Sequence, residues 1–339
     1  MLSRRLLLIA AVAGLAAACS PKPAEDKAAE AGATAQTEIR FATDWRAQGE
    51  HGGFYQALAT GEYAKRGLKV TIVQGGPGVN VPQLLAAGAV ELGMGSNSFI
   101  ALNMANEKAP VKAVAAFFQK DPQVLIAHPG TGVNSIADME GRPILLADAS
   151  VTAFWVWLKS KYGFTDAQVR KYNYSLAPFL ADKRAVVQGY LSSEPYTIEK
   201  EAGFKPATFL LADEGYPGYA TMVLAPNALI TGKPQVVRAF VEATAAGWKS
   251  YLHGDASKAD ALILKDNPEM TPELLANARE QMRNYGIVES GDAAGGNLGA
   301  MSDSRWADFF AVASEQGVYP KSLDYRGAYT LEFVTPKTK

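Results

Sequence analysis

The sequence predicts an α/β protein of two lobes with a cleft between them, and three observations predict this fold class. From residue 38 onward, segments with strand-like patterns alternate with segments of helical periodicity. These segments form two successive βα series, which a mainly helical remainder follows. Strands that alternate with helices favour mostly parallel sheets with helices on both faces.

The chain begins with a segment typical of export. Residues 1–18 combine Arg4 and Arg5, an apolar stretch at 6–12 and a run of small residues before Cys19, which is the pattern of a cleaved signal peptide. The apolar stretch is too short to span a bilayer, because a spanning helix needs roughly 20 residues.

Cys19 is the only cysteine in the chain, so no intrachain disulfide is possible. The run "LAAAC" resembles a bacterial lipoprotein signal, although Ala16 stands where leucine is usual. That resemblance implies lipidation of Cys19, and the alternative is a signal peptide with an incidental cysteine. Residues 19–37 carry almost no bulky apolar side chain and are expected to form a flexible tether.

The first βα series runs from residue 38 to about 128. Strands are expected at 38–45, 68–75, 91–96, 111–119 and 123–129, and helices at 52–67, at 81–90 and from Ser96 or Asn97 onward. Gly67 ends the first helix and Pro82 lies in the first turn of the second.

The second series begins after residue 141. Strands are expected at 142–150, 171–175 and 186–196, helices at 151–163 and 177–185, and extended segments within 204–226. The remaining helices are expected at 233–252, 271–286 and 304–317. Crossovers at 128–130 and 219–222 would divide the chain into lobe 1, of residues 38–128 and about 222–339, and lobe 2, of residues 129–221.

The composition excludes several classes of protein. The 339 residues have a formal net charge of −1, with 48% hydrophobic and 20% charged residues, so a nucleic-acid partner is not expected. The sequence contains no phosphate-binding loop, G-x-S-x-G elbow or H-E-x-x-H motif, and its three histidines are far apart. No metal, cofactor or catalytic residue is therefore predicted.

The first strand is expected to end at a site. Open α/β sheets bind ligands at the carboxyl ends of their strands, and Asp44 and Trp45 lie at such an end. A carboxylate can accept hydrogen bonds from ring N–H groups, and an indole can stack on a planar ring. The alternative is a tryptophan that only closes the lobe.

Three segments, "DWRAQGEHGGFYQALATGEYAKRGLKV", "VPQLLAAGAVELGMGSNS" and "GYLSSEPYTIEKEAG", resemble the NMT1/THI5-like group of periplasmic solute-binding proteins of ABC importers, which includes sulfonate, taurine and pyrimidine-precursor binders. His51, Gly53 and Tyr55 occupy the family's H-x-G-x-Y places. The resemblance implies a type II periplasmic-binding fold, a lipid-anchored monomer in the periplasm, and an inner-membrane permease with a separate ATPase as partners.

Two strand-to-helix junctions are expected to face the cleft. Ser96 and Asn97 open one helix, and Ser150 and Thr152 open another in lobe 2. Free N–H groups at helix starts favour anionic or polar acceptor groups, while ordinary capping explains the same residues. Gly53 and its neighbour Gly52 would let the backbone approach a ligand.

The segment "SSEPY" resembles the family's acidic-proline-aromatic stretch on the second lobe, and this resemblance implies that Glu194 and Tyr196 face the cleft. A buried carboxylate prefers a ligand with N–H donors or positive charge, because leaving it unpaired is costly; the alternative is an exposed glutamate before a turn. Tyr216 and Tyr219 would be ring-stacking walls or hinge packing.

The favoured ligand is a planar nitrogen heterocycle such as a thiamine-related aminopyrimidine. The alternative is a small anion, an alkanesulfonate, taurine or nitrate, held by Arg46 and the two helix starts. Carboxylates facing an anion would repel it. Two further alternatives are an envelope lipoprotein that binds other proteins and an enzyme like the family's pyridoxal-phosphate-dependent pyrimidine synthase, whose cysteine-rich motif this chain lacks.

Overall fold

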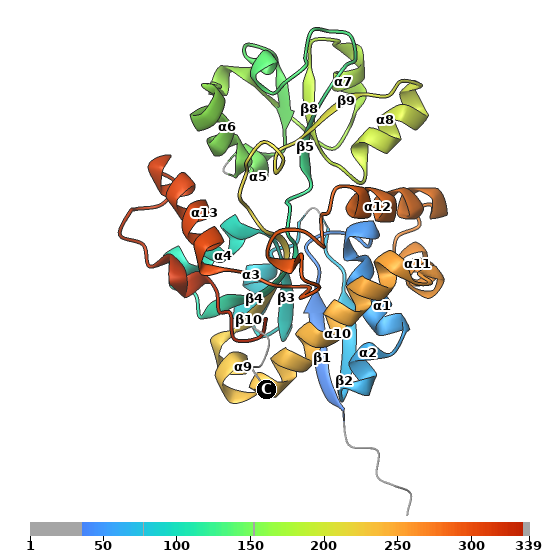
Figure 1. Cartoon of the computed structure of the whole chain (residues 1–339), viewed down its shortest axis with the longest axis vertical. Helices are drawn as coiled ribbons and strands as arrows, with labels where there is room; N and C mark the ends of the chain where they lie inside the picture. The colour runs from blue at the N-terminus through green and yellow to red at the C-terminus, as the bar shows by residue number, and fades with distance from the viewer. Residues whose placement is uncertain (1–35, 77, 152, 335–339) are drawn as a thin grey trace, which may run out of the picture. The chain divides into compact units, whose positions relative to one another are not determined.

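The computed structural model describes residues 36–76, 78–151 and 153–334, which form two α/β lobes, each built on a five-stranded sheet (Figure 1). The predicted signal peptide, Cys19, nearly all of the predicted tether, and Thr152 lie outside the described residues. Within these ranges, no helix is long and apolar enough to cross a membrane.

The first sheet has the strand order β2-β1-β3-β10-β4. Its strands are β1 (Thr37–Ala42), β2 (Leu68–Val73), β3 (Leu92–Asn97), β4 (Val111–Phe118) and β10 (Ala220–Pro226). Strand β1 is parallel to both of its neighbours, whereas β10 is antiparallel to β3 and β4. The return strand β10 thus lies inside the sheet rather than at its edge.

The second sheet has the order β7-β6-β8-β5-β9. Its strands are β5 (Gln123–Ala127), β6 (Ile144–Leu146), β7 (Val169–Lys171), β8 (Val186–Tyr190) and β9 (Ala207–Leu210). The crossover expected at 128–130 is wrong, because β5 pairs with β8 and β9. The chain leaves the first sheet through residues 119–122 and returns through 211–219. The return crossover expected at 219–222 therefore lies too late, because β10 already begins at Ala220.

The helices of lobe 1 include five that come after the return strand β10, and three of these five were predicted. They are α1 (Gly52–Ala59), α2 (Glu62–Lys65), α3 (Val81–Ala86), α4 (Ser98–Asn106), α9 (Asn227–Gly232), α10 (Pro234–His253), α11 (Ser257–Asp266), α12 (Pro272–Asn284) and α13 (Asp303–Glu315). Helices α9 and α11 were not predicted from the sequence.

Lobe 2 contains α5 (Asp148–Val151), α6 (Phe154–Tyr162), α7 (Ala177–Ala181) and α8 (Glu194–Ala202). Three of its predicted strands differ from the structure. The strand expected at 142–150 is limited to β6, because α5 begins at Asp148. The strand expected at 186–196 ends at Tyr190, because Glu194 begins α8 with Pro195 in its first turn. The strand expected at 171–175 lies earlier, at β7, and Tyr174 has a φ of 64°, which a strand residue does not adopt.

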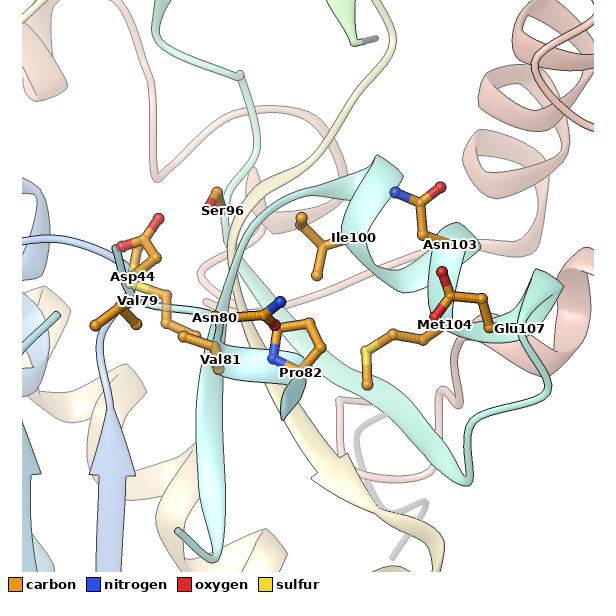
Figure 2. A pocket seen from close by; sticks show the side chains of 11 residues that line it. Asp44, Val79, Asn80, Val81, Pro82, Ser96, Ile100, Asn103, Met104 and Glu107 are labelled. Atoms are coloured by element: carbon orange, nitrogen blue, oxygen red, sulfur yellow. The ribbon is translucent and has the colours of Figure 1, made fainter. Parts of the chain in front are cut away.

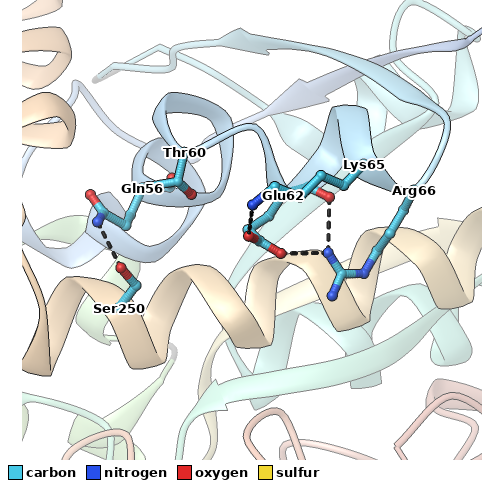
Figure 3. A network of polar contacts seen from close by, with 6 residues as sticks. All are labelled: Gln56, Thr60, Glu62, Lys65, Arg66 and Ser250. Atoms are coloured by element: carbon cyan, nitrogen blue, oxygen red, sulfur yellow. Dashed lines mark hydrogen bonds and ion pairs between the residues drawn. The ribbon is translucent and has the colours of Figure 1, made fainter.

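Helix α10 packs closely against α1 and thereby fixes the loop after β1. A Cβ on Gly53 would lie 2.2 Å from the Trp248 ring, and one on Gly247 would lie 2.2 Å from the Gly53 carbonyl oxygen. Gln56 donates a hydrogen bond of 2.9 Å to Ser250 across the same contact (Figure 3). Gly53 and Gly247 therefore allow α1 and α10 to pack closely. This packing fixes the position of α1 and of the loop that precedes it.

The corner after α1 is closed by local polar contacts. Thr60 Oγ1 donates a hydrogen bond of 2.7 Å to the Gln56 carbonyl at the end of the helix. Glu62 then pairs with Lys65 and with Arg66, each at 2.6 Å (Figure 3). These i,i+3 and i,i+4 pairs suit a single helical turn, so α2 leads directly into β2.

Candidate functional site

The loop between β1 and α1 presents a carboxylate and an imidazole together. Asp44 Oδ1 lies 3.2 Å from His51 Nε2, with His51 fully buried and Asp44 mostly buried. Among the described residues, Nδ1 of His51 has no hydrogen-bond partner. The structure thus brings together two of the predicted site residues, and Asp44 sets the orientation of the imidazole ring.

A second carboxylate of this loop reaches lobe 2. Glu50 is 4% exposed, and its carboxylate accepts a hydrogen bond from the Ser192 hydroxyl. The Ser192 carbonyl accepts a bond of 3.2 Å from Asn277 of α12. Ser192 lies two residues after the end of β8. These contacts therefore join the loop after β1 in lobe 1 to the loop after β8 in lobe 2.

Glu194 is the third carboxylate at the lobe boundary. Together, Asp44, Glu50 and Glu194 are called the carboxylate group below. Glu194 begins α8, and its side chain accepts a hydrogen bond of 2.8 Å from the Tyr190 backbone N–H. Burial raises the pKa of Glu194 to about 7, and the nearby charge of Glu50 adds to this rise while hydrogen bonds oppose it. A carboxylate in this position gains most from a ligand that donates hydrogen bonds.

Burial also perturbs groups around Glu194. It raises the pKa of Asp121, in the outgoing crossover, to about 7, although the Gln123 N–H opposes this. It raises the pKa of Tyr190 well above its ordinary value, with further contributions from Asp121, Asp44 and Glu50. The boundary between the lobes is therefore acidic and poorly solvated.

Aromatic rings from both lobes meet beside these carboxylates. The rings of Trp45 and Tyr174 have centroids 5.2 Å apart, and Tyr174 lies 5.4 Å from Tyr172. Tyr174 is 56% exposed. The charge of Glu194 contributes to the raised pKa of both tyrosines after burial. Aromatic rings that could stack on a ligand and carboxylates that could accept its hydrogen bonds therefore lie side by side.

The two strand-to-helix junctions differ from the prediction. Asn97 is the N-cap of α4 and accepts a hydrogen bond of 3.1 Å from the Phe99 N–H, so the capping interpretation accounts for its side chain. Ser150 is buried within the one-turn helix α5. That helix begins with Asp148, which pairs with Lys171, so a carboxylate already lies at the helix start where an anion was expected.

Several predicted site residues lie elsewhere. Gly53 packs against α10, which corrects the prediction that it lets a ligand approach. Tyr55 is buried and donates a hydrogen bond of 2.8 Å to Asp266 of α11. Tyr196 lies under the Lys200 ammonium on α8, at 5.4 Å. The structure does not bring these side chains to the carboxylate group, because each faces a neighbouring helix or its own.

The tyrosines of the return crossover act in packing. Tyr216 makes edge contacts with Trp157 and Phe309. Tyr219 is 1% exposed, its hydroxyl donates to Asp292, and the Arg305 guanidinium lies 4.1 Å from its ring centroid. The hinge-packing alternative therefore describes both residues better than a ligand-stacking wall.

Arg305 holds both crossovers. Its guanidinium donates to the carbonyls of Gln119 in the outgoing crossover and of Pro217 and Gly218 in the return, the last two at 2.9 Å and 3.0 Å. Arg305, in the C-terminal part of the chain, thus binds both segments that connect the lobes.

A pocket of about 350 Å³ lies between α3 and α4 in lobe 1 (Figure 2). Its polar lining consists of Asp44, Asn80, Ser96, Asn103 and Glu107. Its apolar lining consists of Val79, Val81, Pro82, Met94, Ile100 and Met104. Two predicted site residues, Asp44 and Ser96, therefore line it, and Asp44 is shared with the carboxylate group; we call this space the α3–α4 pocket.

Sequence reasoning missed Glu50, Ser192 and the two tyrosines of "KYNYS". The available signals were an acidic residue directly before His51 and two tyrosines two residues apart at a strand end. Arg46, expected to hold an anion, instead pairs with Glu269 at 2.7 Å, with both side chains exposed.

Known proteins resemble the chain in sequence over most of its length. A family model described as NMT1/THI5 like matches residues 48–255. The chain is 24% identical to the riboflavin-binding protein RibY of Chloroflexus aurantiacus over 334 residues, covering 94% of each chain. It is 22% identical to the formylaminopyrimidine-binding protein of Halalkalibacterium halodurans, covering 89% of this chain and 90% of that one.

Solved structures resemble the chain in fold. The periplasmic aliphatic sulphonate binding protein SsuA of Escherichia coli superposes with a TM-score of 0.64 and 14% identity, over 86% of this chain and 92% of that one. The desulfurization enzyme DSZB superposes with a TM-score of 0.56 and 10% identity, over 88% and 98%. The predicted two-lobed α/β fold of periplasmic binding proteins is confirmed.

Proposed function

The chain belongs to the NMT1/THI5-like family, and from that premise we propose that it is the solute-binding component of an ABC importer. It captures a small solute outside the cytoplasmic membrane and delivers it to a permease whose ATPase is a separate subunit. Lipidation of Cys19 anchors it to the membrane, and the segment before residue 36 links anchor and lobes.

The ligand is a planar nitrogen heterocycle with N–H donors, of the aminopyrimidine or flavin type. One observation carries this proposal: the carboxylates of Asp44, Glu50 and Glu194 gather at the lobe boundary, beside the ring pair Trp45 and Tyr174. Ring N–H and amino groups satisfy buried carboxylates, and the aromatic rings stack on the heterocycle. The two sequence relatives are named for riboflavin and formylaminopyrimidine, which are both planar nitrogen heterocycles.

A small anion fits this boundary poorly. Three carboxylates would repel it, and Arg46 is neutralised by Glu269. The fold resemblance to SsuA does not favour an anion, because at 14% identity it carries no information about the ligand.

Binding is coupled to movement of the lobes. The Glu50–Ser192 contact and the Trp45–Tyr174 pair each join one lobe to the other. A ring that enters between them contacts both lobes at once, so it favours the closed state over the open one by that difference in contact. The permease then recognises the closed state, and the chain itself performs no chemistry.

The test is thermal unfolding of residues 20–339 with an aminopyrimidine, riboflavin, thiamine, taurine, an alkanesulfonate and nitrate. A ligand at about 100 times its Kd adds roughly 2.7 kcal/mol, which moves the midpoint by a few degrees. Trp45→Ala should weaken binding about tenfold or more through lost stacking, and Tyr285→Ala, which removes a ring exposed elsewhere, should not. A midpoint shift with the anions alone would refute the ligand class.

A further inference from the structure

The α3–α4 pocket continues the carboxylate group away from the lobe boundary. Asp44 belongs to both, because its carboxylate lies against His51 and also lines the pocket. From Asp44 the pocket extends along α4 to Glu107 at the far end of that helix (Figure 2). A solute whose ring is bound at Asp44 can therefore extend a substituent into the α3–α4 pocket.

The floor of the pocket is apolar and adaptable. Met94 and Met104 are 4% and 3% exposed, and Ile100 of α4 also lines the pocket. Methionine side chains adjust to irregular shapes because they are unbranched. A volume of about 350 Å³ lies within the usual range for small-molecule pockets, which is more room than a substituent of one or two atoms needs.

The polar rim offers both donors and acceptors. Asp44 and Glu107 are carboxylates at opposite ends, and the pocket lining contains no lysine or arginine. Asn80 and Asn103 use their side-chain oxygens to accept hydrogen bonds from the Gln83 N–H and the Tyr319 hydroxyl. Their amide nitrogens, which can donate hydrogen bonds, belong to side chains that line the pocket.

This rim selects among substituents. A carboxylate or phosphate group would face Asp44 and Glu107 without a cation to offset the repulsion. A protonated amine can only donate, which leaves the amide N–H groups of the asparagines without acceptors. A hydroxyl group both donates and accepts, so several hydroxyls on a short carbon chain match the whole rim, and the carbon chain matches the floor.

We propose that the solute carries a flexible hydroxylated arm on its planar ring, and that the α3–α4 pocket binds this arm. The proposal rests on the proposed function, because it needs the ring at Asp44. It adds a second determinant of specificity within lobe 1. The ring is recognised at the lobe boundary, and the arm is recognised by Asn80, Asn103 and Glu107.

The test compares matched compounds with and without the arm. Lumiflavin and riboflavin share one ring system, and only riboflavin carries a ribityl chain. The second pair is 4-amino-2,5-dimethylpyrimidine and its 5-hydroxymethyl analogue, which differ by one hydroxyl group. Calorimetric titration of the 20–339 chain should show binding about tenfold tighter for the armed member of at least one pair, which is the effect of two ordinary hydrogen bonds.

Variants assign that preference to the pocket. Ile100→Trp fills the space with an indole and should reduce the ratio to near one while affinity for the unarmed member stays unchanged, which also shows that the variant is folded. Asn103→Ala should reduce the ratio in part. Asn106→Ala, an exposed asparagine on the same helix outside the pocket lining, should leave it unchanged.

Three results would overturn the proposal. If the members of both pairs bind equally to the wild-type chain, the arm is not recognised, although the importer function stands. If the preference survives Ile100→Trp, the arm binds elsewhere. If none of the heterocycles binds, the proposed ligand class fails and the arm pocket fails with it.

Discussion

Replacing Glu194 with glutamine should change how stability depends on pH. Burial raises the pKa of Glu194 from an ordinary 4.5 to about 7, so between these values the folded chain binds more protons than the unfolded chain. Stability contributed by the protonated group is therefore complete below pH 4.5 and is lost as the pH rises through 7.

The size of the effect follows from the two pKa values. At about 1.36 kcal/mol for each pH unit, the difference between 4.5 and about 7 corresponds to about 3 kcal/mol of ionisation penalty above pH 8. Glutamine keeps the shape of the side chain and can still accept the Tyr190 N–H bond, yet it never ionises. Glu194→Gln should thus be more stable than the wild type at pH 8 and nearly equal to it at pH 4.5.

Urea unfolding of the 20–339 chain at intervals from pH 4.5 to 9 measures this difference. Glu199→Gln on the same helix is the matched control, because Glu199 is exposed and its replacement should leave the pH profile unchanged. Parallel wild-type and Glu194→Gln profiles would show that Glu194 is not held in a poorly solvated site, and would remove the main reason for a ligand with N–H donors.

Three further outcomes follow from the packing and the ion pairs. Gly53→Ala places a Cβ 2.2 Å from Trp248 and should lower the free energy of unfolding by about 1–3 kcal/mol with ligand affinity retained, whereas Gly76→Ala meets nothing within 4 Å; lost affinity at unchanged stability would mean that Gly53 touches the ligand. Arg305→Met removes the charged donor to three crossover carbonyls and should destabilise the chain by about 2–3 kcal/mol in urea unfolding; an unchanged midpoint would contradict the role given to this contact. Arg46→Ala should leave solute affinity unchanged in calorimetry, since Arg46 already pairs with Glu269, and a large loss would favour an anionic ligand.

The sequence was sufficient for features that depend on local pattern. Asp44 and Trp45 were predicted as site residues because they end a strand-like run, and Glu194 was predicted because "SSEPY" resembles a segment of the family. The prediction that they bind the ligand stays a prediction, while their convergence at the lobe boundary is a property of the structure.

Features that depend on long-range pairing could not be predicted. Strand β5 was assigned to the wrong lobe because all five of its residues are buried, and a uniformly apolar run does not reveal which sheet surrounds it. The Glu50–Ser192 contact joins residues 142 positions apart. Gly52 and Gly53 looked like a ligand-facing loop, since the sequence does not show that Tyr251 and Trp248 lie against them.

The position of β10 determines the order in which the lobes can be completed during synthesis. About 100 residues separate β4 from β10, and β10 lies between β3 and β4 in the sheet. The first sheet therefore cannot be completed until all of lobe 2 has been synthesised. Strands β5 to β9 are contiguous in the chain and can pair earlier. Until β10 pairs with them, β3 and β4 each have a backbone edge with unpaired N–H and C=O groups, and such edges favour aggregation.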